Sequence, residues 1–274
     1  MPAAWVRRVV FAAVSMTVGL AASTSHAQGQ GDPPTVRDYC IKVAPGKAAE
    51  YEAFLHDVAV PLAQARADSG EFAWAVVSRA VVPAGSSARC DYRVAYGYKG
   101  LPPEEISKEG LDAALKRAKL ALTADQLIAK RTALTSLVAT EIWSRIDGIG
   151  PDAERGGYVR FNHYGVRNGE MAEWVRLETT YWKAVMDAWL KAGGKGGWGV
   201  FTLAMPGGES TPYNVVTVDT FPDWNGLVRG VPAEDLWPKV HPGTTVTDVF
   251  QRLDKARSIH DVEIFKIAEV VTAK

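Results

Sequence analysis

Four histidines lie beyond the first 27 residues, and His163 is the one whose position suggests chemistry. It shares strand parity with Val159 and Phe161 in the strand predicted over residues 158–166, so its ring can point into an apolar interior. An imidazole in such a place can act as a general base near neutral pH. The simpler interpretation, which we favour, is a core histidine hydrogen-bonded to a neighbouring group.

Asp219 is the second candidate for catalysis, because it ends a row formed by Tyr213, Val215 and Thr217 on one face of a predicted strand. If buried, its carboxylate has to be paired or to face a cavity. Its place near the strand end favours an exposed side chain instead.

Five residues are candidates for binding a ligand: Tyr158, Asn162, Tyr164, Trp74 and Trp198. The first three share the parity of Arg160, opposite to that of His163, and offer hydrogen-bonding groups. The two tryptophans begin two predicted hairpins, and aromatic rings lining a cleft suit a flat apolar ligand. Core packing explains most of the eight tryptophans beyond the first 27 residues.

The recognisable motifs of metal and cofactor chemistry are absent from the sequence. It contains no H-x-H, H-E-x-x-H, CxxC, GxSxG or P-loop pattern. We therefore predict no metal site and no cofactor. Glu141 and Glu263 begin two predicted closing strands, and we expect structural ion pairs with Arg131 and with Arg252 or Arg257.

The elements that position these residues occur twice. Residues 74–96 and 198–221 each read as a β-hairpin, with β-branched and aromatic runs broken by proline and glycine. An offset of 123 residues also aligns glycines and a proline at element boundaries, namely Gly46 with Gly169, Gly70 with Gly193, Pro83 with Pro206 and Gly85 with Gly208. We infer a duplicated β-α-β-β-α-β unit.

The order of elements divides the chain into five parts. Residues 1–27 read as a secretory signal peptide, with Arg7-Arg8 before an apolar run and small residues before Gln28. We predict a disordered leader over 28–36, a first unit over 37–147, a linker over 148–157 and a second unit over 158–274. Within these units we expect a first strand at 39–43, a helical break near Leu122-Thr123, and a loop through the prolines of 222–242.

Charge and composition exclude some functions. Beyond residue 27 the chain has 29 basic and 31 acidic residues, a formal charge of −2, and no basic block. This gives no electrostatic case for binding nucleic acid, and we expect no stable membrane insertion after signal cleavage. We predict a periplasmic or secreted protein.

A single β-α-β-β-α-β unit carries both helices on one face of its sheet and leaves the other face bare, so two copies can bury each other's faces. In this respect the chain resembles the dimeric α+β barrel (ferredoxin-like) superfamily in a tandem form. The resemblance rests on V-A-P-G-K-A-A-E-Y (43–51), V-R-N-G-E-M-A-E-W (166–174) and the two hairpins. The P-G-G-E-S-T-P-Y hairpin (206–213) and the E-I-W and E-I-F closing strands are most similar to NIPSNAP-like exported bacterial proteins of unknown function.

The resemblance implies an α+β fold in which two antiparallel sheets pack face to face within one chain, and a monomeric pseudo-dimer. It also bears on Cys40 and Cys90, which an oxidising compartment can join. In this fold the first and third strands are neighbours, which we take to be parallel, and the two cysteines lie near the start of each. We therefore predict a disulfide between Cys40 and Cys90.

Four functions follow from the resemblance and the residues. The first is binding of a small apolar or aromatic molecule, without an assigned reaction. The alternatives are a cofactor-free monooxygenase-like enzyme, a haem-binding protein and a non-catalytic interaction module. Related haem proteins take a proximal histidine from a helix of the second half, where this chain offers only His260 near the helix end. An interaction module predicts an interior filled by side chains.

Overall fold

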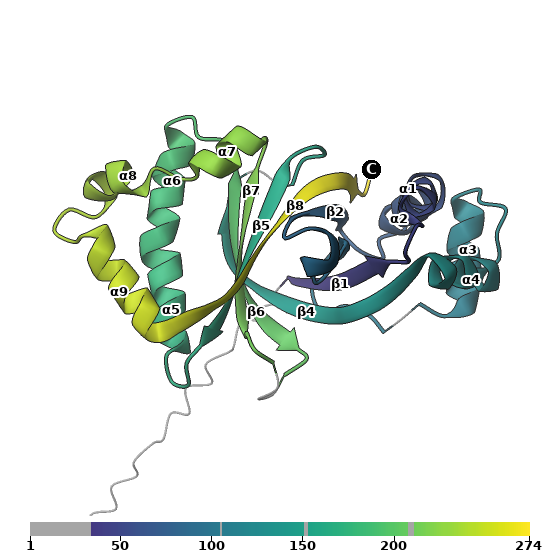
Figure 1. Cartoon of the computed structure of the whole chain (residues 1–274), viewed down its shortest axis with the longest axis horizontal. Helices are drawn as coiled ribbons and strands as arrows, with labels where there is room; N and C mark the ends of the chain where they lie inside the picture. The colour runs from purple at the N-terminus through teal and green to yellow at the C-terminus, as the bar shows by residue number, and fades with distance from the viewer. Residues whose placement is uncertain (1–33, 105, 151–152, 208–210) are drawn as a thin grey trace, which may run out of the picture. The chain divides into compact units, whose positions relative to one another are not determined.

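The strands join edge to edge into one closed antiparallel barrel in the order β1-β3-β2-β8-β5-β7-β6-β4 (Figure 1). The computed structural model describes residues 34–104, 106–150, 153–207 and 211–274. The strands are β1 (Thr35–Val43), β2 (Trp74–Val82), β3 (Tyr92–Tyr98), β4 (Thr135–Ile149), β5 (Tyr158–Val166), β6 (Gly197–Met205), β7 (Val215–Phe221) and β8 (Arg257–Thr272).

Each predicted unit contributes four consecutive strands of this barrel. The first unit gives the order β4-β1-β3-β2 and the second gives β8-β5-β7-β6, and the units are joined by the pairs β2–β8 and β4–β6. Strands β4 and β8 are the longest, with 15 and 16 residues, because the first part of each pairs within its own unit and the last part pairs across to the other. The predicted fold class, two α+β units forming an intrachain barrel, is confirmed.

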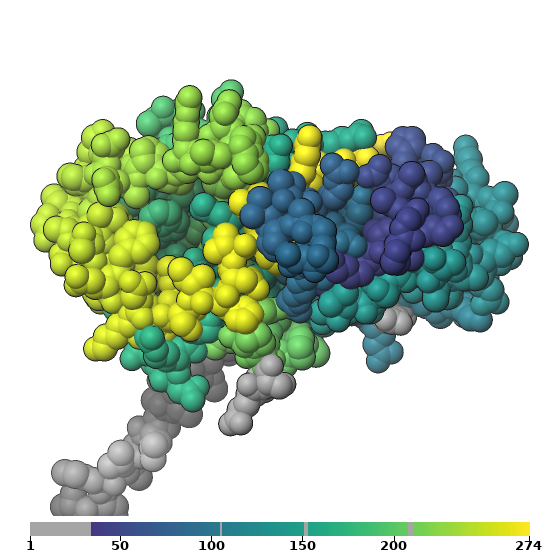
Figure 2. All heavy atoms as spheres, viewed as in Figure 1, coloured from purple at the N-terminus to yellow at the C-terminus, as the bar shows by residue number. Residues whose placement is uncertain are grey.

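The helices cover the outer faces of the sheets, those of the first unit at one end and those of the second at the other (Figures 1 and 2). Side chains of one strand parity therefore face the barrel interior, and those of the other parity pack beneath helices. The helices are α1 (Ala48–Phe54), α2 (Val60–Asp68), α3 (Lys108–Arg117), α4 (Ala124–Leu134), α5 (Met171–Arg176), α6 (Lys183–Lys191), α7 (Trp224–Arg229), α8 (Ala233–Val240) and α9 (Val246–Ala256).

The first helix of each unit is interrupted at the same place by a π-helical turn. These turns cover Leu55–Ala59 between α1 and α2, and Leu177–Trp182 between α5 and α6. Pro61 lies in the first turn of α2 directly after the first of them. Such turns change which residues of a helix face the sheet, and they are frequent near functional sites.

Local sequence signals explain several of the boundaries. Thr123 caps α4 by accepting a hydrogen bond from the backbone N–H of Gln126, which confirms the predicted break in this helical region. The paired glycines of the repeat also have a conformational reason. Gly46 and Gly169 have φ of +76° and +86°, where a side chain would be strained, at the same turn before the first helix of each unit.

Three expectations about element positions were wrong. β1 begins at Thr35, so Thr35 and Val36 belong to the first strand and not to the leader. The segment 222–245 is not a continuous loop, because it contains α7 and α8. Pro238 lies inside α8 near its end, where the loss of one backbone donor is tolerated by so short a helix.

Cys40 and Cys90 form the predicted disulfide, with Cα atoms 5.2 Å apart. The predicted strand orientation was wrong, because β1 and β3 are neighbours but antiparallel. Cys40 lies toward the end of β1, and Cys90 lies two residues before β3 begins. The hairpin reverses the chain between β2 and β3, so β3 runs opposite to β1 and its start meets the far end of β1.

The predicted signal peptide, residues 1–27, lies outside the described residues. Among the residues that the structure describes, no helix has the length and apolar character needed to cross a membrane.

Candidate functional site

The barrel encloses a cavity of about 430 Å³ lined by residues from all eight strands. Most of the lining is apolar or aromatic, including Trp74, Trp143, Phe161, Phe201 and Val218. The size and character of this cavity are those of a site for a small organic molecule.

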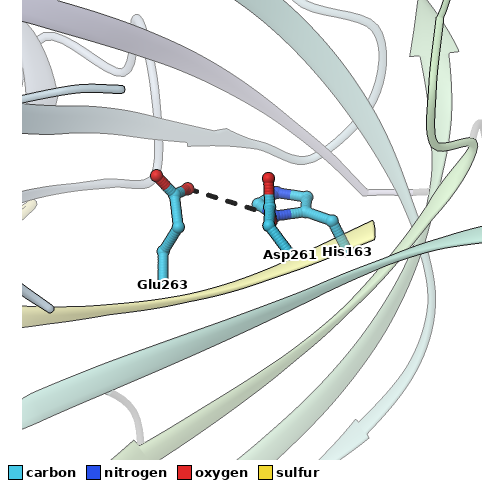
Figure 3. A group of neighbouring side chains, drawn as sticks. All are labelled: His163, Asp261 and Glu263. Atoms are coloured by element: carbon cyan, nitrogen blue, oxygen red, sulfur yellow. Dashed lines mark hydrogen bonds and ion pairs between the residues drawn. The ribbon is translucent and has the colours of Figure 1, made fainter. Parts of the chain in front are cut away.

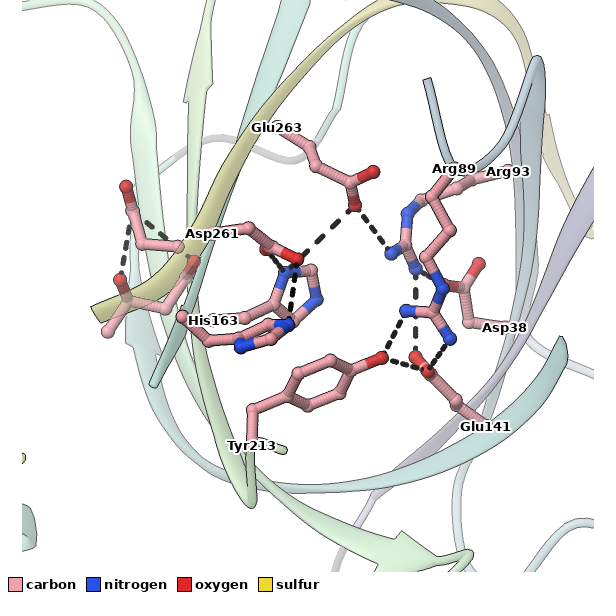
Figure 4. Close-up of polar contacts among 11 residues, drawn as sticks. Asp38, Arg89, Arg93, Glu141, His163, Tyr213, Asp261 and Glu263 are labelled. Carbon is pink, nitrogen blue, oxygen red and sulfur yellow. Dashed lines mark hydrogen bonds and ion pairs between the residues drawn. The ribbon is translucent and has the colours of Figure 1, made fainter. Parts of the chain in front are cut away.

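Charged side chains from four strands gather in the barrel interior at one end of this cavity, which Asp38, Arg93 and His163 help to line. Arg93 of β3 is their centre and is almost fully buried (Figure 4). Its guanidinium donates hydrogen bonds to Asp38 of β1 and, at 2.8 Å, to Glu263 of β8. Glu141 of β4 lies 3.7 Å from the same guanidinium. Three carboxylates from three strands therefore share one arginine.

The acids around Arg93 respond differently to their burial. Burial raises the pKa of Asp38, and the neighbouring Glu141 adds to this, so that the attraction of Arg93 is outweighed. Burial also opposes ionisation of Glu141, but Arg93 and the hydrogen bond from Tyr213 lower its pKa. Asp38 is thus protonated more easily than an aspartate in water, while Glu141 is held as a carboxylate.

Tyr213 and Arg89 complete this cluster on the side of Glu141. The Tyr213 hydroxyl donates to Glu141 and accepts from Arg89, and Arg89 also donates to Glu141 at 3.0 Å. Burial, followed by the adjacent Glu141 carboxylate, raises the pKa of Tyr213. The phenol therefore stays protonated and acts as a hydrogen-bond donor.

His163 is buried in the barrel interior and bonded to a neighbour, as in the interpretation that we favoured. Its Nδ1 lies 2.5 Å from Oδ1 of Asp261, and its ring packs against those of Tyr213 and Trp143. Partial burial raises the pKa of Asp261, but the hydrogen bond with His163, together with the electrostatic attraction of His163, His260 and Arg93, outweighs this and lowers it. The Nε2 atom of His163 is buried and has no hydrogen-bond partner.

Asp219 is buried, not exposed as we expected, and it lies on the opposite face of the sheet from His163. It accepts hydrogen bonds from Arg160 at 3.0 Å and from Asn162 at 2.9 Å. The register of β5 and β7 pairs Arg160 directly with Asp219, so the acid is held by a cross-strand ion pair. His163 and Asp219 therefore do not form one site.

Asn162 and Tyr164 also lie beneath the helices of the second unit rather than in the cavity. Tyr164 packs under Arg257, whose guanidinium carbon lies 3.7 Å from the ring centre. Arg257 donates to Glu178 of the π-helical turn at 2.8 Å. Burial, followed by the nearby Asp219, raises the pKa of Glu178 to about 7 even though Arg257 lowers it.

This shift predicts a pH dependence of stability. The folded protein keeps the Glu178 proton up to about pH 7, whereas the unfolded chain loses it near the ordinary value of 4.5. The free energy of unfolding should therefore fall as pH rises from about 4.5 to 7, by about 3 kcal/mol from this group alone. Urea unfolding at several pH values measures it.

The matched variants are Glu178→Gln and Glu50→Gln, the second at an exposed position. Glu178→Gln should lose this part of the pH dependence, and Glu50→Gln should keep it. If the free energy of unfolding changes with pH in the same way in Glu178→Gln and in the unsubstituted protein, the raised pKa of Glu178 is contradicted.

The remaining ligand candidates are divided between the two faces. Trp74 lines the cavity, and its indole lies so close to Gly97 that a Cβ there would be 2.0 Å from the ring. Trp198 touches the cavity but packs mainly in the core beneath the second unit's helices. Tyr158 lies on the outer face, 5.5 Å from the ring of Trp224.

The predicted ion pairs of the closing strands had the wrong partners. Glu141 pairs with Arg89 and Arg93, and Glu263 pairs with Arg93. Arg252 bonds instead to Glu173, and Arg257 bonds to Glu178. Arg131 of α4 and Arg252 of α9 are exposed, and Arg257 lies under the helices, whereas both glutamates point into the barrel.

The sequence interpretation missed Asp38, Arg93 and Asp261. A signal for the first two is present, since Asp38 shares strand parity with Val36 and Cys40, and Arg93 shares that of Ala95. A charged residue at an inward position of two neighbouring strands predicts a buried ion pair. Asp261 carries the same signal, since it shares strand parity with Glu263 and Phe265, and the register shift between His163 and Tyr164 lies beyond it.

The haem alternative required a helical histidine of the second unit. His260 lies on β8 instead, and the described helices α5, α6 and α9 contain no histidine. His241 follows α8, where its Nε2 lies 2.9 Å from the backbone oxygen of Tyr181. These residues do not fit an axial haem ligand in the expected place.

Comparison with known proteins identifies the fold but no family. No family model matches the sequence, and no curated protein matches it. Among solved structures, a proposed monooxygenase from Lactobacillus acidophilus NCFM superimposes with a TM-score of 0.54 at 10% identity, covering 88% of this chain and 97% of the other. One from Fusobacterium nucleatum subsp. nucleatum gives 0.54 at 7% identity, covering 88% and 95%.

A haem-binding protein from Thermus thermophilus matches less well, with a TM-score of 0.47 at 13% identity, covering 87% of this chain and 92% of the other. At these identities the likeness establishes the fold alone. The protein is thus a tandem α+β barrel of the dimeric α+β barrel type, with a closed interior that holds an apolar cavity and a buried charged cluster.

Proposed function

We propose that the barrel cavity binds a small, largely apolar molecule with a flat or aromatic shape. The observation that carries this proposal is the cavity of about 430 Å³, whose walls are mostly apolar or aromatic and whose polar lining includes Asp38, Arg93, Arg145 and His163. A ligand with an apolar body and a single polar group matches such a lining. An interaction module, in contrast, predicts an interior filled by side chains, and the cavity counts against it.

The charged cluster supports a preferred orientation of this ligand. Asp38, Arg93 and His163 meet the cavity at one end, while Trp74 and Val159 line it farther along the strands. A polar group of the ligand at the charged end and an apolar ring between the walls would satisfy both regions. Because proposed monooxygenases have this fold, an oxygenase-like reaction is a second candidate function. No residue of the cavity supports that reaction independently of the fold.

Narrowing the cavity should weaken binding without altering the surface. Val218→Phe adds a ring at a cavity-lining position of β7, and Val228→Phe makes the same change at an exposed position of α7. With 1-aminoanthracene as a neutral fluorescent probe, we expect Val218→Phe to weaken binding by about tenfold or more, or about 1.4 kcal/mol. Val228→Phe should bind like the unsubstituted protein.

Equal probe affinity in the two variants would refute the cavity as the binding site. Circular dichroism of both variants controls for loss of fold. Native mass spectrometry of protein exported from a periplasmic expression host then identifies any co-purifying natural ligand by its mass.

We further propose that the protein is exported and related to NIPSNAP-like bacterial proteins. Export is supported by the signal-like pattern of residues 1–27 and by the Cys40–Cys90 disulfide, which an oxidising compartment favours. The relationship rests on the hairpin and closing-strand residues. The second copy of the unit occupies the sheet edges of the first, which supports a monomer.

A further inference from the structure

The interior faces of β5 and β8 bring together three side chains able to bind a metal ion. His163 is directly opposite Asp261 in the antiparallel register, and Glu263 lies two residues further on the same face of β8 (Figure 3). Nδ1 of His163 is 2.5 Å from Oδ1 of Asp261 and 4.0 Å from Oε2 of Glu263. All three ligand atoms lie within 4.8 Å of one another.

From this geometry we propose that His163, Asp261 and Glu263 bind a divalent first-row transition ion such as Zn²⁺. One imidazole and two carboxylates form a ligand set that suits such ions, whereas Ca²⁺ and Mg²⁺ prefer oxygen alone. Metal–ligand bonds of about 2.1 Å place neighbouring ligand atoms roughly 3 to 3.5 Å apart. The His163–Asp261 contact has to open slightly and Glu263 has to approach, both within reach of side-chain rotation.

The charge of the surrounding cluster favours a cation. Four carboxylates, those of Asp38, Glu141, Asp261 and Glu263, surround two guanidinium groups, those of Arg89 and Arg93, and the imidazole of His163 (Figure 4). An uncompensated negative charge in a buried site is costly, and a bound cation removes it.

Unpartnered polar atoms give a second, independent reason. Oε2 of Glu141 is buried without a hydrogen-bond partner, and so is Oδ1 of Asp38. Both belong to carboxylates that converge on Arg93, next to Glu263 (Figure 4). Buried polar atoms are normally satisfied, so these two oxygens, together with the unpartnered Nε of Arg93 and Nε2 of His163, mark an interior whose hydrogen bonding is incomplete. A cation with one or two bound waters supplies the missing positive charge and donors.

The site is accessible from two sides. The side chain of Asp261 remains 32% exposed, which gives an ion a route from solvent. His163 lines the cavity, so a coordination position that the protein leaves open can meet a polar group of a bound molecule. The metal proposal does not depend on the proposed apolar ligand, because the ion alone can be titrated.

Calorimetric titration of Zn²⁺ into the chelator-treated mature protein tests the proposal. We expect one site in the unsubstituted protein, and binding weakened by at least about tenfold in Asp261→Asn and in Glu263→Gln, a change of about 1.4 kcal/mol or more. The matched control is Asp57→Asn. Asp57 forms a histidine–carboxylate pair with His56 at 2.8 Å, like that of His163 and Asp261, but on the protein surface.

Asp57→Asn should bind Zn²⁺ like the unsubstituted protein. The proposal is overturned if the unsubstituted protein binds no Zn²⁺, or if Asp261→Asn binds it equally well. Because removing a buried carboxylate can impair folding, a second measurement uses only the unsubstituted protein. Co²⁺ should give intense visible bands of a low-coordinate site that Zn²⁺ displaces, and their absence would also overturn the proposal.

Discussion

Replacing Arg93 by methionine should lower the free energy of unfolding by about 3 to 5 kcal/mol, because it leaves three buried carboxylates without their shared cation. Arg93 is almost fully buried and contacts Asp38, Glu141 and Glu263. Methionine keeps much of the apolar volume of the side chain, so the loss reports charge rather than a cavity. Urea unfolding at neutral pH measures the effect.

Two further variants separate the charge effect from simple truncation. Arg79→Met makes the same substitution at an exposed arginine that pairs with Glu52, and should cost less than about 1 kcal/mol. Adding Glu263→Gln to Arg93→Met should recover part of the lost stability, since it removes one of the stranded charges. If Arg93→Met and Arg79→Met lose the same free energy of unfolding, the cluster is not held together by Arg93.

Removing the disulfide should have an effect of similar size. The bond joins residues 50 apart, and closing a loop of that length restricts the unfolded chain enough to stabilise the fold by about 4 kcal/mol. The double variant Cys40→Ala, Cys90→Ala should therefore unfold at a much lower urea concentration than the oxidised protein. Reductant should lower the stability of the unsubstituted protein toward that of the variant.

Reductant should not change the stability of the double variant toward urea. This measurement controls for effects of reductant on other groups. Mass spectrometry under denaturing conditions should give the oxidised protein a mass about two daltons below its reduced form. The same spectrum reports whether the mature chain begins at Gln28. If reductant does not change the stability of the unsubstituted protein, Cys40 and Cys90 do not form a stabilising disulfide.

The two units differ most where they meet inside the barrel. At an offset of 123 residues, Asp38 and Arg93 of the first unit correspond to Phe161 and Val216 of the second. The repeat keeps the backbone but exchanges a charged pair for an apolar one. Closing the barrel then brings Asp38 and Arg93 of the first unit next to His163 and Glu263 of the second, so the charged cluster combines residues of both units.

Local patterns in the sequence were enough to predict the strands, the hairpins and the duplicated unit. Alternation along residues 158–166 placed His163 on an inward face, since strand parity is a local property. The glycines of the repeat marked turns that need positive φ. The same kind of local reading failed for residues 222–245, where prolines predicted a loop but the packing of Leu236 and Trp237 beneath α6 and α9 favours helices.

The partners of the buried charges were decided only by the tertiary structure. Arg93 meets Asp38, Glu141 and Glu263 across separations of 55, 48 and 170 residues, and no local pattern encodes such pairings. They depend on the registers of β1–β3, β1–β4 and β5–β8, and on the pairing of β2 with β8 that closes the barrel. Asp219 was misjudged for the same reason, because its burial depends on helices that cover the strand from a distant part of the chain.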